Sequence, residues 1–233
     1  GGDMALFAIG DLHLGLALDK PMHIFGEDWK EHPQKIQAFW EKEIDENDTV
    51  LIPGDISWAM RMEEAMADLE WLHRLPGRKI LIKGNHDYWW GSVTKMNEMF
   101  EDIHFLQNNF FPYEQYAICG TRGWICPNDR QFTEHDRKIY QRELHRIQLS
   151  LDEAIKKGYR DFIVMTHYPP TNDRLEPSGF TEIYEQYGVQ KVIYAHLHGK
   201  DFFKFGLQGK HREVSYYLTS CDYLDFRPLK ILD

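Results

Sequence analysis

The sequence predicts an α/β protein in which helices pack on a central sheet arrangement. Three features support this prediction. Short runs of residues are almost continuously apolar, as in strands that are buried on both faces. Amphipathic patterns with the period of a helix lie between these runs. The runs also close with glycine or a polar residue, which is where ligand sites gather in open α/β sheets.

Six segments are expected to form strands. The first three end in glycine and a polar residue, and the next two end in histidine. The sixth is the chain's tail, which we expect to form one more strand. In chain order, the six segments are 5–11, 49–55, 79–85, 161–167, 191–196 and 211–220.

Three longer patterns are expected to form helices. One begins near Pro33, because proline is favoured in the first turn of a helix. The second runs over 61–75 and ends at the Pro-Gly pair 76–77. The third begins near Thr133 and ends at Gly158. We interpret the methionine and aromatic stripes of these helices as core positions rather than as cofactor contacts.

Composition limits the possible partners. The chain has 233 residues, and we expect 1–233 to form a single domain. Its formal net charge of −10 makes a nucleic-acid partner improbable, because phosphate neutralisation supplies most of the affinity of such binders. A small phosphorylated substrate is still compatible with this charge, since bound metal ions would supply local positive charge.

The cysteine count and hydropathy indicate the setting of the protein. Its three cysteines show no C-x-x-C pair, so we expect buried thiols in a reducing, cytoplasmic environment. No apolar run approaches the roughly 18 residues that are needed to cross a bilayer, so no membrane span is expected.

Polar side chains that can bind metal follow five of the predicted strands. A lone aspartate after glycine is usually a turn or cap residue, and a lone histidine is usually a core or surface residue. Five such features on successive strand ends are poorly explained by turn chemistry. The eight residues concerned are Asp11, His13, Asp55, Asn85, His86, His167, His196 and His198.

Seven of these residues form a coherent ligand set for two divalent ions. Asp55 is the natural carboxylate bridge between the ions. We expect one ion to be held by Asp11, His13 and His198, and the other by Asn85, His167 and His196. Ligands of these types suit Mn, Fe, Zn or Co.

The ordered motifs D-x-H, G-D, G-N-H-D, H and H-x-H resemble those of the calcineurin-like metallophosphoesterase superfamily, over residues 11 to 198. The resemblance implies a four-layer α/β/β/α sandwich and a dinuclear metal site that hydrolyses a phosphate ester. It also implies that His86 contacts the scissile phosphate and protonates the leaving oxygen as a general acid. A hydroxide that bridges the metals would attack phosphorus in line.

The second motif departs from the pattern of many relatives. Trp58 stands where a second aspartate would orient the catalytic histidine, and Asp87 is a candidate for that orienting role. The motif also lacks the arginine of the protein serine/threonine phosphatases, which counts against that activity. The third motif reads G-N-H, whereas the UDP-diacylglucosamine pyrophosphatases of the lipid A pathway read G-N-R, so their substrate is disfavoured.

Several residues near the motifs could contact substrate. Arg122 is a candidate phosphate clamp, although a surface arginine in a turn fits the sequence equally well. Trp89 and Trp90 follow the G-N-H-D motif, where packing is favoured over stacking on a base. The proline-rich segment 167–179 is expected to form the rim of a pocket.

These observations favour a metal-dependent phosphohydrolase that acts on a small phosphodiester, or else on a phosphomonoester. One alternative is a nuclease of the same fold that acts on DNA ends. The other is a catalytically degenerate module that binds a protein partner. Such a module should have lost ligands, whereas all seven predicted ligands and His86 are present.

Overall fold

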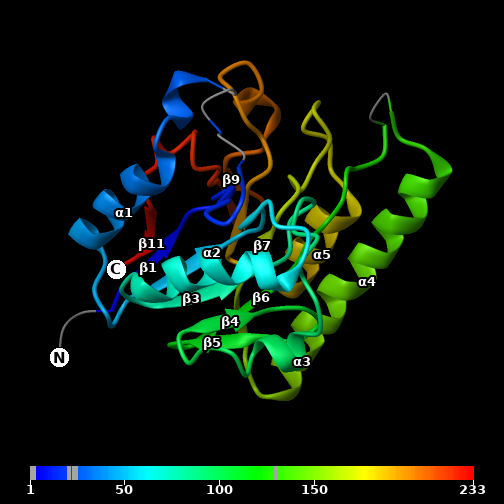
Figure 1. The fold of residues 1–233 in the computed structure, drawn as a ribbon. Coiled ribbons are helices and arrows are strands. Elements are labelled where there is room, and N and C mark those ends of the chain that lie inside the picture. Colours follow the sequence, from blue (N-terminus) through cyan, green and yellow to red (C-terminus); the bar gives the residue numbers. More distant parts are fainter. Residues whose placement is uncertain (1–3, 20–21, 23–25, 129–130) are drawn as a thin grey trace.

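The computed structural model describes residues 4–19, 22, 26–128 and 131–233 as two packed β-sheets with helices on both outer faces (Figure 1). The first sheet contains, in spatial order, β11 (Leu229–Leu232), β1 (Leu6–Ala8), β2 (Thr49–Ile52), β3 (Arg78–Leu81) and β4 (Ile103–Phe105). Its strands β1 to β4 are parallel, and β11 runs antiparallel to β1.

The second sheet contains, in spatial order, β5 (Phe111–Tyr113), β6 (Tyr116–Thr121), β7 (Asp161–Thr166), β8 (Lys191–Tyr194), β10 (Val214–Leu218) and β9 (Gly209–His211). The four central strands are parallel, and the two edge strands are antiparallel to their neighbours. Parallel strands place their carboxyl ends at one edge of a sheet, so the loops that follow β6, β7 and β8 lie close together.

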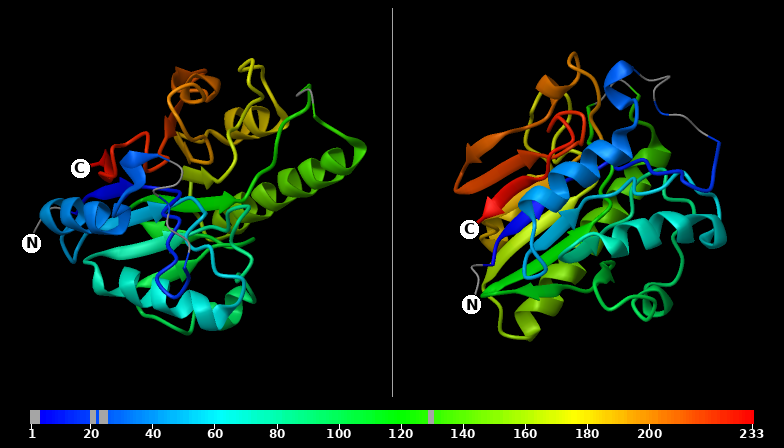
Figure 2. Two further views of the ribbon diagram at one scale, coloured as in Figure 1. Left: turned by 45° about the horizontal axis from the view of Figure 1, so that its top comes forward. Right: turned by 60° about the vertical axis from the view of Figure 1, so that its left-hand side comes forward.

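The helices form the two outer layers (Figure 2). Helices α1 (His32–Glu43) and α2 (Met62–Arg74) share a buried cluster with the first sheet. Helices α4 (Glu134–Lys156) and α5 (Gly179–Tyr187) share another cluster with the second sheet. The short helix α3 (Val93–Met96) contacts β4. The 3-10 turns Glu27–Trp29 and Phe203–Phe205 lie in loops.

Alternation along the strands explains why the two sheets pack face to face. In β7, Phe162 and Val164 point towards the helices, whereas Ile163 and Met165 point towards the other sheet. A strand with apolar residues on both faces must be covered on both faces. The layers therefore follow the order helix, sheet, sheet, helix, and the predicted α/β/β/α sandwich is confirmed.

The predicted helices form with the expected ends. Pro33 lies in the first turn of α1. Thr133 caps α4 through a reciprocal pair of hydrogen bonds with Asp136. Gly158, just beyond α4, has a φ of 94°, which is a backbone conformation that glycine adopts readily. Within the described residues, no helix combines the length and apolar character that crossing a bilayer requires.

The predicted strand at 211–220 is wrong in its extent. This segment belongs to a hairpin that joins β9 to β10, and Arg212 and Glu213 form the turn with φ values of 48° and 68°. Hairpin turns of this kind normally use asparagine or glycine. Because an arginine and a glutamate occupy the turn, the sequence carries no turn signal there.

Candidate metal centre

The loops after β1, β2, β3, β7 and β8 converge at one edge of the sandwich and carry the predicted ligands. Four of the predicted ligands have left-handed backbone conformations. They are Asp11, His13, Asp55 and His196, with φ values of 55°, 44°, 53° and 76° respectively. Such conformations are uncommon outside glycine and concentrate at functional sites. Each strand thus ends a few residues before its ligand, and a tight loop turns the side chain towards the centre.

Two glycines allow the loops to approach closely. A β-carbon at Gly84 would overlap the backbone nitrogen and the carboxylate of Asp55. Gly54 has a φ of 94°, and a β-carbon there would lie 2.7 Å from Nδ1 of His167. Glycine is required at both positions, because only a residue without a side chain lets the β2 and β3 loops touch.

The carboxylate of Asp87 binds the loop that carries Asp55, and not the side chain of His86. Its carboxylate is completely buried and accepts five hydrogen bonds of 2.8–3.1 Å, from the backbone N–H groups of Asp55, Ile56, Ser57 and Gly84 and from the indole of Trp89. Burial, followed by the charge of Asp55, raises the pKa of Asp87 to about 7, although the backbone donors favour the carboxylate form. None of these five bonds involves the imidazole of His86, so the structure does not give Asp87 the expected orienting role.

Asp11, His13 and His198, which we call the first donor group, come together as predicted. Nε2 of His13 lies 3.3 Å from Nε2 of His198. Oδ1 of Asp11 lies 4.0 Å from Nε2 of His13 and 3.7 Å from Nε2 of His198. The three side chains therefore point donor atoms at one small volume, as ligands of a single ion would.

Asn85, His167 and His196, which we call the second donor group, also come together. Nε2 of His167 lies 2.8 Å from Oδ1 of Asn85 and 3.3 Å from Nδ1 of His196. Oδ2 of Asp55 lies 3.4 Å from the same nitrogen of His167 and 3.7 Å from Nε2 of His13. Asp55 thus lies between the two donor groups, in the position expected of a bridge.

Asp11 also lies between the donor groups, which the sequence did not predict. Its Oδ1 is 3.9 Å from Nδ1 of His167, in addition to its contacts with the first donor group. This oxygen is buried and has no hydrogen-bond partner among the described residues. A buried carboxylate oxygen without a partner is costly, and a cation is the group that would satisfy it. The residues present therefore fit a metal site.

The pKa values of the site show how strongly it attracts positive charge. Burial lowers the pKa of His167, but the charge and hydrogen bond of Asp55 outweigh it and bring the pKa to about 9. Burial also lowers the pKa of His198, but Asp11 and Asp222 outweigh this effect and raise the pKa to about 10. The carboxylates thus favour positive charge at both histidines, in the place where metal ions would supply it.

Burial disfavours the charged form of the other two histidines in the donor groups, His13 and His196. Burial lowers the pKa of His13 to about 4 and that of His196 to about 3. The pKa of Asp55 falls well below its ordinary range, because His167 and His13 outweigh the opposing effect of burial. Neutral imidazoles and ionised carboxylates are the forms that bind metal.

Comparison with known proteins identifies the family. Residues 4–200 match the sequence profile of the calcineurin-like phosphoesterases. The chain belongs to this family. Gene 66 protein of Mycobacterium phage L5 is 38% identical over 77 residues, which are 33% of this chain and 37% of that protein. The chain thus matches little more than a third of that relative's length.

Solved structures share the fold of this phosphoesterase over nearly its whole length. Phosphopantetheinyl hydrolase (PptH) from Mycobacterium tuberculosis has a TM-score of 0.60 and 14% identity, covering 98% of this chain and 96% of that one. The protein of unknown function AQ665 from Aquifex aeolicus has a TM-score of 0.54 and 17% identity, with the same coverage. At these identities the likeness concerns the fold alone.

His86 lines a cavity of about 400 Å³ that opens onto the donor groups. Its backbone N–H donates to Oδ1 of Asp55 at 2.9 Å, and the amide of Asn85 lies 3.3 Å from its Nε2. Trp58, in place of the second aspartate of many family members, packs between two histidines. Its ring centroid is 4.7 Å from that of His86 and 4.7 Å from that of His13. An aromatic face thus packs against His86 at the position where the motif resemblance led us to expect a carboxylate.

Two residues in contact with the donor groups, Asp222 and Trp29, escaped the sequence analysis. Oδ1 of Asp222 lies 3.0 Å from Nδ1 of His198, and Oδ2 accepts the N–H of Gly199 at 3.0 Å. Trp29 forms edge contacts with His13 and His198 across the same cavity. Asp222 follows β10, a sixth strand end with a carboxylate, so this strand-end pattern is the signal that could have revealed it.

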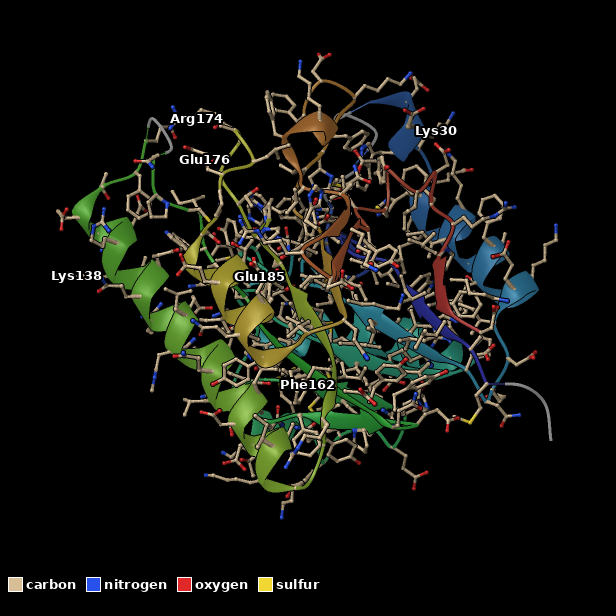
Figure 3. The ribbon with its side chains drawn as sticks, turned by 180° about the vertical axis from the view of Figure 1, so that it is seen from behind. Lys30, Lys138, Phe162, Arg174, Glu176 and Glu185 are labelled. Carbon is tan, nitrogen blue, oxygen red and sulfur yellow. The ribbon has the colours of Figure 1, made fainter. Side chains whose placement is uncertain are left out.

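The other predicted substrate contacts lie outside the His86 cavity. The side chain of Arg122 lines a neighbouring cavity. Trp89 is buried and Trp90 donates to Gln107 at 3.1 Å, so the packing role is confirmed for Trp89. Of the predicted rim segment 167–179, residues between Tyr168 and Asp173 line a further cavity of about 250 Å³ together with His196. Figure 3 shows Arg174 and Glu176 on the outer part of this segment.

All three cysteines, at positions 119, 126 and 221, are buried. Burial raises the pKa of the Cys119 thiol to about 12, which keeps it protonated and unreactive. The expectation that the cysteines are buried is therefore confirmed.

Proposed function

We propose that this phosphoesterase is a hydrolase that uses two divalent ions to cleave a small phosphodiester. The observation that carries the proposal is the buried oxygen of Asp11, which has no hydrogen-bond partner in the described part of the chain and lies between two converging donor groups. Asp11, His13 and His198 would hold one ion, and Asn85, His167 and His196 would hold the other. Asp55 would bridge them. Ions of Mn, Fe, Zn or Co suit these donors.

When bound, the two ions supply an activated water nucleophile and neutralise charge on the phosphoryl oxygens. His86 lines the same cavity and would donate a proton to the leaving oxygen. Asn85 and Trp58 flank its imidazole and restrict its rotation. A leaving group with a high pKa needs this proton most, so the contribution of His86 should grow with leaving-group pKa.

The walls of the cavity favour a substrate with an organic group on phosphorus. Trp29, Trp58 and Met22 line the cavity beside His13 and His86, and they present apolar surface. A diester places an organic group on each side of phosphorus, and one of them would contact these rings. A phosphomonoester is the alternative within the same chemistry.

The test is hydrolysis of bis-p-nitrophenyl phosphate and p-nitrophenyl phosphate, side by side, with Mn²⁺ and with a chelator. Metal-dependent cleavage of the diester supports the proposal. Cleavage of the monoester alone would show that the activity is that of a phosphatase and not of a phosphodiesterase. An absence of turnover with two bound metals contradicts hydrolysis of aryl esters and supports the binding-module alternative.

Nucleic acid stays outside the proposed substrate class, because the chain carries a formal net charge of −10. A salt titration of binding to a short DNA duplex tests this point. A nuclease that neutralises several phosphates would show a steep decrease of affinity with salt concentration. We expect no measurable duplex binding at physiological ionic strength.

A further inference from the structure

A second cavity, of about 280 Å³, is lined by four cationic side chains. They come from three places in the fold: the loop after β3, the loop after β6 and the middle of α4. These residues, which we call the cationic pocket, are Lys83, Arg122, Arg142 and Arg146.

The cationic pocket adjoins the metal centre through the backbone. Lys83 precedes the ligand Asn85 by two residues. The carbonyl of Arg122 accepts the N–H of His167 at 2.9 Å and that of Tyr168 at 3.1 Å. The loops that carry these two cations are therefore the same loops, or direct neighbours of the loops, that carry the second donor group.

Charge in the pocket is not balanced by the protein. Among the described residues, Glu143 is the one carboxylate within ion-pair distance of these side chains. Four cations and one carboxylate leave a formal charge of +3 in a chain whose net charge is −10. Like charges that converge in a cavity repel one another, and an anion in the cavity relieves that repulsion.

Glu143 has little capacity left for the cations. It is completely buried, and its Oε1 already accepts hydrogen bonds from Thr121 Oγ1 at 3.0 Å and from the Gly123 N–H at 3.1 Å. Its Oε2 accepts one bond, from Arg146 at 3.2 Å. The carboxylate thus serves mainly to fix the β6 loop to α4.

Two arginines of the pocket have hydrogen-bond donors that no described residue satisfies. The Nε of Arg122 is buried and has no hydrogen-bond partner among the described residues. Its side chain is only 16% exposed and packs over the ring of Trp124 at 4.7 Å, so the guanidinium is held in place. Arg142 reaches Glu143 only at 3.9 Å, beyond hydrogen-bond distance. Guanidinium groups whose donors the protein leaves unsatisfied are suited to phosphate oxygens.

We propose that the cationic pocket binds a phosphate group other than the one that is cleaved at the metal centre. This group is either a second phosphate of the substrate or a free phosphate ligand. The first source rests on the proposed hydrolase function, and the second does not. In both cases the arginines donate charge-assisted hydrogen bonds to the phosphate oxygens.

The first experiment measures binding of inorganic phosphate to the metal-loaded full chain by isothermal titration calorimetry. We expect two binding events per chain. Arg142→Gln should weaken one of them by at least about tenfold, the effect of losing a charge-assisted hydrogen bond. The fold should persist, because the guanidinium of Arg142 is half exposed and its nearest carboxylate, Glu143, keeps the bond from Arg146.

Two further variants keep this experiment interpretable. Lys138→Gln changes the same charge on an exposed position of the same helix (Figure 3) and should leave both binding events unchanged. Arg146→Gln should weaken the same event as Arg142→Gln. If Arg142→Gln, Arg146→Gln and Lys138→Gln all bind phosphate as the wild type does, or if the wild type binds only at the metals, the proposal is overturned.

The second experiment separates the two sources. Alkanediol bisphosphates of three to eight carbons are compared with the monophosphates of the same length as hydrolysis substrates. A lower KM for a bisphosphate, abolished by Arg142→Gln, identifies the second phosphate of a substrate. Equal KM values, together with phosphate binding that depends on Arg142, identify a free phosphate ligand. Phosphate binding by the pocket without any hydrolysis would contradict the proposed function and still support the pocket.

Discussion

The two donor groups of the metal centre differ in their surroundings. His198 of the first donor group is 33% exposed and faces the His86 cavity, whereas His167 of the second donor group is fully buried. The outer nitrogen of His198 contacts the carboxylate of Asp222 at 3.0 Å. The outer nitrogen of His167 contacts the backbone carbonyl of Pro53 at 2.8 Å.

This difference predicts that the two ions are bound unequally. A carboxylate behind a histidine makes the imidazole a stronger donor, while a backbone carbonyl fixes only its orientation. Burial does not separate the two groups, because Asn85 and His196 of the second donor group are half-buried and His196 also lines the His86 cavity. We therefore expect the ion of the first donor group to be held more tightly, because a carboxylate lies behind His198, and chelators to remove the ion of the second donor group first. The predictions below test this asymmetry, beginning with the change that should destroy both sites.

Asp55→Asn should weaken the binding of both ions and so remove the difference between the two donor groups, because Asp55 contacts both groups. Its Oδ2 lies 3.7 Å from His13 and 3.4 Å from His167. Replacing the bridging carboxylate by an amide should lower the affinity of both ions by more than about 100-fold, beyond the range for outer partners of ligands. Metal content after dialysis and the hydrolysis rate should fall together. The exposed Asp201→Asn is the matched control, and full metal content in Asp55→Asn would contradict the bridge.

His86→Ala should separate metal binding from turnover. His86 lines the cavity without belonging to either donor group, so both ions should remain bound. The rate should fall by about 10²–10⁴-fold for alkyl esters, the usual contribution of a general acid, and less for nitrophenyl esters. The exposed His135→Ala serves as the control. A full rate on an alkyl phosphate ester would rule out His86 as the acid.

Contiguous motifs explain why most of this centre was predictable from the sequence. Each ligand lies within a few residues of a strand end, so strand order alone brings Asp11, Asp55, Asn85 and His167 to one edge. The layered fold followed from the same motifs and from the apolar strands. The role of Asp87 was not predictable, because its partners are backbone groups of another loop whose path depends on the fold.

The cationic pocket could not be predicted from the sequence. Arg142 and Arg146 lie on α4, where a charged residue usually marks a solvated face. Only packing of α4 against β6 turns them towards Arg122 and Lys83. Long side chains from distant segments leave no local pattern, whereas short ligands on tight loops do.

Asp222→Asn should affect the first donor group alone. The amide keeps a hydrogen-bond acceptor for Gly199 but no longer places a negative charge behind His198. We expect one ion to lose about 10- to 100-fold in affinity and the other to be unchanged. A competitive titration with a metal-binding dye measures both constants. Equal weakening of both sites would contradict the independence of the two donor groups.

Trp58→Leu should have the smallest effect and tests whether an aromatic ring replaces the carboxylate that orients the histidine in relatives. The ring stacks on His13 with an interplanar angle of 24° and lies against His86 at 43°. Such contacts contribute about 0.5–1.5 kcal/mol, so turnover should fall roughly two- to tenfold while both ions stay bound. Trp58→Phe, which keeps an aromatic face, should recover most of the rate.

A double-mutant cycle decides whether Trp58 acts through His86. If the ring positions the imidazole, Trp58→Leu should slow the wild type but should have no further effect in the His86→Ala background. An equal loss in both backgrounds would place the effect on His13 and its ion instead. The cycle therefore shows whether the aromatic wall of the cavity belongs to the acid or to the first donor group.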